Sequence, residues 1–195
     1  MADLITLQTY KDAEGLSTPK EDLRINALIP SISQLVKTYC GNSFVDYYSS
    51  AKTEILNVDW GTHIVQLTES PVNSITSVQE RTSYSGAYTT LTTGAYEYYL
   101  ESSTDSILRT TSAGYKNWPT GVGAVKVVYT AGWSTIPKDL ELAVVDLITY
   151  YLKDEHKSRR TLAGASIQNE SSTSQNNNVA FPDHIKRVLD LYKNF

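Results

Sequence analysis

The stretch that decides the fold is residues 125–152, VKVVYTAGWSTIPKDLELAVVDLITYYL. Its first seven residues place Val125, Val127 and Tyr129 on one face, as in a half-buried β-strand. From Pro137 onward, apolar residues recur three and four positions apart, which is typical of an amphipathic helix. This stripe consists of Leu140, Ala143, Val144, Leu147, Ile148, Tyr151 and Leu152. The stretch therefore predicts a strand followed by a helix near 137–157.

A second helix is predicted upstream, near 19–40. Thr18-Pro19-Lys20-Glu21 has the pattern of a capping box with proline at the first helical position. Helical spacing of apolar residues continues to Tyr39, and Gly41 supplies a left-handed stop. Because proline inside a helix costs about 3 kcal/mol, Pro30 predicts a kink or a break near Ile29.

Residues 41–136, between these helices, have the composition and punctuation of an antiparallel β-rich block. They hold 28 of the 43 Ser and Thr residues and 9 of the 14 Tyr residues. Hydroxylated and aromatic side chains suit the surfaces of sheets. Short alternating runs, including one from Leu56 to Trp60 and another from Tyr96 to Leu100, are separated by turn residues. Turns this close together favour meanders over helical crossovers.

The C-terminal part combines a polar linker with one more helix. Residues 158–180 lose periodicity and are rich in Ser, Asn and Gln, so we expect a flexible linker. Pro182 then opens an amphipathic helix near 182–193. The predicted fold is α+β, a helical bundle with an inserted antiparallel β-rich block. Its parts are 1–40 and 137–157 as helical framework, 41–136 as insertion, 158–180 as linker and 181–195 as a docking helix.

Composition excludes several classes of protein. No apolar run approaches the roughly 20 residues that span a bilayer. The N-terminus lacks the pattern of a secretory signal, so we expect synthesis in the cytoplasm. One cysteine and three histidines offer no zinc cluster. A formal net charge of −4 gives no general attraction for nucleic acid.

No catalytic or cofactor-binding constellation is apparent. Cys40 and His63 could form a nucleophile and base, but a small buried side chain at a helix end is the favoured interpretation of Cys40. Asp154-Glu155-His156 could bind a metal, but three adjacent helical residues point in different directions, so a solvated helix end is favoured. The glycines Gly121 and Gly123 precede a strand, whereas a phosphate loop opens a helix. We therefore expect no enzyme, no cofactor and no metal.

The order of these elements resembles the head–tail connector (adaptor, or head completion) proteins of tailed bacteriophages. The resemblance is carried by LIPSISQLVKTYCGNSF at 28–44, SPVNSITSV at 70–78 and Trp118-Pro119. It continues with VKVVYTAGW at 125–133, IPKDLELA at 136–143 and the helix that follows Phe181-Pro182. It covers roughly residues 4–157 and resumes at 181–195.

This resemblance implies a structural protein of the virion neck. Such proteins form a ring, commonly a dodecamer, beneath the portal protein, extend the DNA channel and present a platform for the next head-closure or tail protein. A closed ring needs two different complementary faces on each copy, and hydroxyl-rich surfaces suit such contacts. DNA would pass through the channel without sequence-specific binding, and no membrane is involved.

Residues 158–195 are the predicted portal-docking arm, because a polar linker before an amphipathic helix suits ordering on a partner. The candidate docking residues are Arg159, Arg160, Phe181, Ile185, Lys186, Arg187, Val188, Leu189, Tyr192 and Phe195. Arginine would contribute its bidentate guanidinium group. Two simpler alternatives remain open: the arginines are merely solvated, and the helix folds back onto the helices of its own chain.

An alternative function of a different class is a carbohydrate- or receptor-binding β module on a helical stalk. Trp60, Trp118, Tyr84 and Tyr88 would then serve as stacking platforms and would have to be exposed together on one surface.

Overall fold

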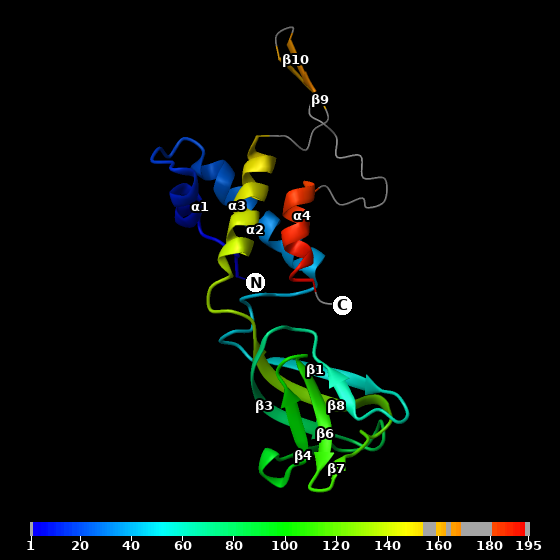
Figure 1. Cartoon of the computed structure of the whole chain (residues 1–195). Coiled ribbons are helices and arrows are strands. Elements are labelled where there is room, and N and C mark those ends of the chain that lie inside the picture. Colours follow the sequence, from blue (N-terminus) through cyan, green and yellow to red (C-terminus); the bar gives the residue numbers. More distant parts are fainter. Residues whose placement is uncertain (1, 154–158, 163–164, 169–180, 194–195) are drawn as a thin grey trace. The chain divides into compact units, whose positions relative to one another are not determined.

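The computed structural model of the chain describes residues 2–153, 159–162, 165–168 and 181–193. Its helices and antiparallel sheets confirm the predicted α+β class (Figure 1). The chain divides into a helical unit, Met1–Gly41 with Ile136–Lys193, and a β unit, Asn42–Thr135. Each unit is described by itself.

The described helices are α1 (Leu7–Glu14), α2 (Asp22–Cys40), α3 (Lys138–Leu152) and α4 (Asp183–Asp190). The core of the helical unit is the apolar stripe predicted for α3, packed on α2: Leu140, Val144, Leu147 and Ile148 are fully buried, as is Val36 of α2. Helix α1 was not expected from the sequence. It begins at Leu7 and is capped by Thr6, whose hydroxyl accepts from the Thr9 amide at 3.1 Å. The Tyr10 hydroxyl lies 2.9 Å from that of Thr149 on α3.

Helix α2 differs from the prediction at its start and in its middle. It begins at Asp22, and Glu21 occupies the cap position without a side-chain bond, so the predicted capping box at Thr18 is wrong. The helix runs without a break through Pro30, where we expected a kink or a break. Burial of Ile25, Ile29, Ile32 and Val36 along one side outweighs the lost hydrogen bond. The predicted stop at Gly41 is confirmed, with φ of 65°.

Two antiparallel sheets form the β unit. The first has the order β1-β8-β3-β4 and the second β2-β6-β5, with the short β7 also paired to β6. The strands are β1 (Lys52–Val58), β2 (Ile64–Gln66), β3 (Val72–Glu80), β4 (Thr89–Leu91), β5 (Tyr98–Glu101), β6 (Ser106–Thr111), β7 (Gly114–Tyr115) and β8 (Gly121–Ala131). A 3-10 turn, η1 (Thr93–Ala95), precedes β5. The core of this unit contains the predicted face of β8, and Val125, Val127 and Tyr129 are fully buried.

The segment predicted as a linker contains a strand pair. Strands β9 (Arg159–Leu162) and β10 (Ala165–Gln168) are antiparallel, with Arg160 opposite Ile167. The rest of that predicted linker, residues 158, 163–164 and 169–180, lies outside the described part of the chain.

Candidate interaction surfaces

The C-terminal helix α4 packs on α2 and α3 of its own chain. Phe181, Ile185 and Leu189 are almost completely buried there, with exposed fractions of 3%, 1% and 0%. The Phe181 ring meets the edge of Tyr39 on α2 at a centroid distance of 5.0 Å. The Cys40 thiol at the end of α2 donates to the Leu189 carbonyl at 3.5 Å. The helix therefore folds back onto the helices of its own chain, which was one of the two simpler alternatives.

Two tyrosine–aspartate hydrogen bonds hold the end of α4. Tyr39 donates to Asp190 at 2.5 Å, and Tyr192 donates to both carboxylate oxygens of Asp139 on α3 at 2.7 and 2.8 Å. Burial and these bonds to carboxylates raise the pKa of Tyr39 and of Tyr192 to about 12. The bond from Tyr192 lowers the pKa of Asp139. Both tyrosine hydroxyls therefore keep their proton at physiological pH and can donate it to these carboxylates.

The predicted docking residues fall into three groups. Phe181, Ile185 and Leu189 face the core of the helical unit, because an amphipathic helix buries its apolar stripe on the nearest apolar surface. Four residues are accessible on α4 and just after it: Arg187 is exposed, and Lys186, Val188 and Tyr192 are half-buried. The backbones of Arg159 and Arg160 lie in β9. The side chains of these two arginines, and all of Phe195, lie outside what the structure describes.

One of the aromatic residues proposed as a stacking platform is buried. Trp118 is 2% exposed and belongs to the core of the β unit, so its prediction as an exposed platform is wrong. The guanidinium of Arg109 lies 5.8 Å from its ring. Tyr84, by contrast, is 75% exposed, and Tyr88 is half-buried, with Arg81 over both rings at 5.0 and 4.8 Å.

Trp60, the fourth member of that set, lies in the loop between β1 and β2. It was predicted to continue the first strand, but β1 ends at Val58. The Trp60 side chain is 90% exposed.

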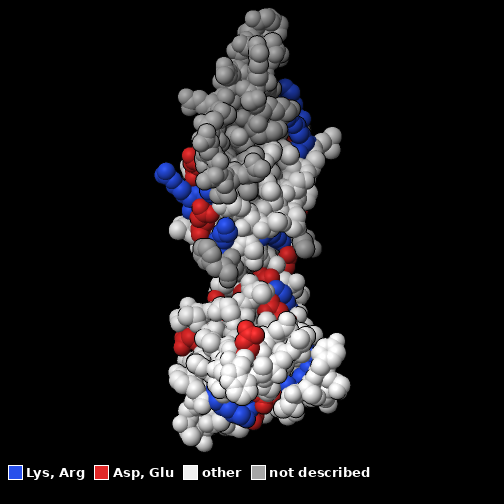
Figure 2. Space-filling view, turned by 90° about the vertical axis from the view of Figure 1, so that its right-hand side faces the viewer, with Lys and Arg blue, Asp and Glu red and all other residues white. Residues whose placement is uncertain are grey.

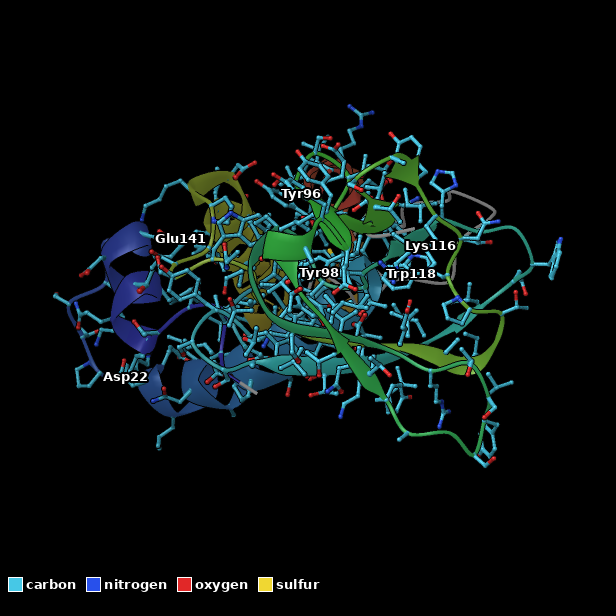
Figure 3. All side chains as sticks on the ribbon, turned by 90° about the horizontal axis from the view of Figure 1, so that it is seen from below. Asp22, Tyr96, Tyr98, Lys116, Trp118 and Glu141 are labelled. Carbon is cyan, nitrogen blue, oxygen red and sulfur yellow. The ribbon has the colours of Figure 1, made fainter. Side chains whose placement is uncertain are left out.

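The β unit also contains a groove that was not predicted from the sequence. It has a volume of about 700 Å³, and its aromatic lining comes from Tyr96, Tyr98, Tyr99 and Tyr115. The apolar side chains of Ile75, Leu100 and Leu108 also line it. We call this feature the tyrosine groove. Figure 3 shows Tyr96 and Tyr98 on the part of the ribbon that forms it.

Comparison with known proteins assigns the chain to a family. The family model described as "Head completion protein" matches residues 3–195, almost the entire chain. The chain belongs to the head completion protein family. This confirms the resemblance stated from the sequence.

A curated relative of this head completion protein is the "Head completion protein" of Escherichia phage T5. The two are 29% identical over 72 residues, which cover 36% of this chain and 39% of the phage T5 protein. The match thus spans about two fifths of that relative's length.

Solved structures share the fold along nearly the whole chain. A chain in the neck of an empty gene transfer agent particle, computed with C6 symmetry, has a TM-score of 0.59 and 18% identity over 98% of this chain and 90% of that chain. A chain in the neck of the native particle, computed with C12 symmetry, has a TM-score of 0.55 and 18% identity, over 100% of this chain and 94% of that chain. A chain of the native gene transfer agent virion has a TM-score of 0.60 and 17% identity, over 98% of this chain and 90% of that chain. The head completion protein thus has the fold of proteins that stand in a virion neck.

Cys40 and His63, the two residues considered above as a catalytic pair, are each packed against other parts of the fold. Cys40 is fully buried, as predicted, and burial raises the pKa of its thiol to about 12. His63 belongs to the β unit, where its ring packs beside Tyr115 at 5.0 Å. The described residues contain no group of three acidic, histidine or cysteine side chains that could hold a metal, and Asp154-Glu155-His156 lies outside them. Within those residues no helix is long and apolar enough to cross a membrane.

A buried polar cluster joins the start of the β unit to its first sheet. Lys52 lies 2.7 Å from Glu54 and 2.8 Å from Glu69. Glu54 also accepts from Tyr129 at 2.9 Å, and Glu69 accepts from the amide and hydroxyl of Ser43 at 2.9 Å each. Burial alone would raise the pKa of Glu54, but its bonds from Lys52, Thr68 and Tyr129 lower it overall. These bonds pair the buried carboxylates of Glu54 and Glu69 with donors.

Proposed function

We propose that this protein is a non-enzymatic structural component of the neck of a tailed-phage-like particle, where identical copies form a ring beneath the portal protein. The observation that carries the proposal is the family match over residues 3–195. The shared fold with chains of virion necks, over 98% or more of this chain, supports it. Symmetries of C6 and C12 in those necks support a ring, which we propose to be a dodecamer.

The surface chemistry of the β unit suits a part through which DNA passes. On the face shown in Figure 2, uncharged surface covers most of this unit, and the few basic groups lie among acidic ones. Tight binding of duplex DNA requires several Lys and Arg side chains placed together on phosphates. A face with so few basic groups, on a chain of net charge −4, would let the duplex slide. We therefore propose that the ring extends the DNA channel without sequence-specific contacts.

For the portal contact we propose the outward side of α4. Lys186 and Arg187 are accessible there, beside the half-buried Val188, whereas Ile185 and Leu189 hold the helix in place. Docking through this side leaves the core of the helical unit intact. A downstream head-closure or tail protein would bind elsewhere on the ring.

Charge reversal tests the portal contact without unfolding α4. We expect Lys186→Glu with Arg187→Glu to weaken binding to purified portal protein at least tenfold while the melting temperature stays unchanged. The matched control reverses two exposed lysines elsewhere, Lys20→Glu with Lys116→Glu, and should bind as the wild type does. Equal binding by both double variants would exclude the outward side of α4 as the contact.

Native mass spectrometry tests the ring itself. We expect the protein mixed with portal protein to add as multiple copies in a ratio of one per portal subunit. Addition of a single copy, or no addition, would contradict the proposed assembly.

A further inference from the structure

Strand β5 forms one edge of the second sheet. In the order β2-β6-β5, its one neighbour among the described strands is β6. The Thr110 amide donates to the Glu97 carbonyl at 3.0 Å just before β5 begins. Because bonded and unbonded residue pairs alternate along an antiparallel ladder, the N–H and C=O of Tyr99 also point toward β6. Those of Tyr98 and Leu100 point the other way, to the open side of the strand.

The tyrosine groove runs along this open edge. Successive side chains of a strand point to opposite faces of the sheet, so Tyr98 and Leu100 lie on one face of β5. Tyr99 and Glu101 lie on the other face, and side chains of both faces line the groove. A groove lined from both faces follows the edge between them. Its volume of about 700 Å³ lies within the usual range of ligand pockets, about 300–1,000 Å³.

An open strand edge beside a groove is suited to bind an extended peptide as an added strand. In that mode, main-chain hydrogen bonds supply affinity, and pockets for alternate side chains supply specificity. The backbone groups of Tyr98 and Leu100 are available for the hydrogen bonds. The groove supplies the side-chain contacts, because Tyr96, Tyr99 and Tyr115 are 69%, 56% and 72% exposed although they line it. Tyrosine is enriched among the residues that dominate binding energy at protein interfaces.

The charge of the groove indicates a basic occupant. Among the described lining residues only Glu101 is charged, and it accepts from the Ser103 hydroxyl at 2.8 Å. A Lys or Arg side chain of the occupant could pair with this carboxylate and also lie over a tyrosine ring. Within this chain, the guanidinium of Arg81 lies over Tyr84 and Tyr88 in that way, at 5.0 and 4.8 Å. With no basic group in the described lining, the groove does not attract the phosphates of DNA.

A second copy of this chain fits the site poorly. The polar stretch 161–182 contains Glu170 and no Lys or Arg, so it would bring a like charge to Glu101. The edge strands of the β unit are attached to their own sheets, and a single extended segment suits a groove better. Both observations favour a segment of a different protein.

We propose that the edge of β5 and the tyrosine groove bind an extended, basic segment of the downstream head-closure or tail protein as an added strand. This inference rests on the proposed function, which supplies that neighbour and assigns the portal contact to α4. The added strand would bond to the backbone of Tyr98 and Leu100. Its basic side chain would pair with Glu101.

Photo-cross-linking in assembled particles identifies the occupant. Tyr99 is replaced by benzoylphenylalanine, an aromatic residue that bonds covalently to its neighbours under ultraviolet light. We expect a cross-link to a segment of the downstream protein that contains Lys or Arg. The same replacement at Tyr84, 75% exposed on the same unit but outside the groove lining, is the matched control and should not reach that segment. Adding Glu101→Lys should lower the yield at least fivefold, whereas adding Asp59→Lys, at an exposed site, should leave it unchanged.

Amide exchange tests whether the occupant adds as a strand. A synthetic peptide with the sequence of the cross-linked segment is titrated into the isolated full-length protein, and amide exchange is followed by NMR. We expect the amides of Tyr98 and Leu100 to exchange at least tenfold more slowly when the peptide is bound. The amide of Tyr99 already faces β6, so its exchange rate should change little.

Each result has a defined meaning. A cross-link to the downstream protein together with slowed exchange at Tyr98 and Leu100 supports the proposal. A cross-link to the portal protein or to a second copy overturns the occupant, and unchanged exchange at both amides overturns strand addition. Particles that contain this protein and the downstream protein but give no cross-link overturn the site, while the neck assignment stands. Wild-type particles that lack this protein by immunoblot overturn the proposed function itself.

Melting temperature separates a lost contact from misfolding. Tyr99 is 56% exposed and Glu101 is half-buried at the surface, so the variants at both positions should melt within a few degrees of the wild type.

Discussion

At the residue scale, Gly132 in the sequence YTAGW is the most constrained position of the β unit. Its φ is 93°, and a Cβ built on it would lie 1.8 Å from the carbonyl oxygen of Phe44. The amide of Trp133 donates to that same oxygen at 2.8 Å, and the rings of Phe44 and Trp133 stack at 5.9 Å. Only glycine lets the end of β8 approach Phe44 this closely.

Gly132→Ala should therefore destabilise the β unit by at least about 3 kcal/mol, because the new methyl group must displace backbone. Gly61→Ala is the matched control: its φ is 79°, but nothing lies within 4 Å of the new Cβ, so only the backbone strain of about 1–2 kcal/mol remains. Urea unfolding followed by tryptophan fluorescence measures the free energy of unfolding of both variants, since Trp60, Trp118 and Trp133 all belong to this unit. Equal losses of stability in Gly132→Ala and Gly61→Ala would contradict the close approach of Gly132 to Phe44.

The buried carboxylate of Glu54 predicts a defined pH dependence. Its pKa is lowered from an ordinary value of 4.5, so the ionised form stabilises the fold above that pH, and the benefit disappears as pH falls through the lowered pKa. Glu54→Gln should cost about 2 kcal/mol at neutral pH. The difference in melting temperature between Glu54→Gln and the wild type should become smaller below about pH 4.5. Asp59→Asn, at an exposed site, should show no comparable difference at any pH.

At the element scale, the packing of α4 on α2 and α3 can be followed through Cys40. Because the thiol donates to the Leu189 carbonyl and is fully buried, a thiol reagent reaches it only when the packing opens. Leu189→Ala removes a fully buried side chain, a change that typically costs 2–5 kcal/mol. We expect at least a tenfold faster modification of Cys40 at pH 8 in this variant. Lys186→Ala, on the outward side, should leave the rate within twofold of wild type.

The helices show which elements sequence alone can predict. The stripe from Leu140 to Ile148 and the apolar side of α4 were predicted because their periodicity is internal to the helix. Helix α1 was missed because only Tyr10 of its eight residues is buried. Its boundaries were nevertheless marked by Thr6 and Gly15, which cap it in the structure. The uninterrupted course of α2 through Pro30 depends on packing that no local pattern encodes.

Strand β6 was missed for a different reason. Arg109, only 3% exposed, interrupts the apolar alternation of this strand. Its guanidinium pairs with Glu80 of β3 at 2.8 and 2.9 Å, a partner 29 positions away in the sequence. A buried charge is tolerated only with such a partner, and a single sequence does not show which residue it is. The tyrosine groove was missed likewise, because Ile75, Tyr99 and Tyr115 meet only through strand pairing.

At the scale of the whole molecule, the surplus of Ser, Thr and Tyr fits a protein whose surfaces bind other proteins. The sequence predicted a head–tail connector, and the family match over residues 3–195 confirms that membership. Of the predicted docking residues, Phe181, Ile185 and Leu189 are buried in the helical unit. We therefore propose the portal contact for accessible groups on the outward side of α4, such as Arg187.

Electron cryomicroscopy of the particle's neck is the most direct test of the central claim. The account predicts a ring of identical copies beneath the portal, into whose density the helical unit and the β unit each fit as separate bodies. Absence of the ring from particles whose portal is well resolved would contradict the proposed role.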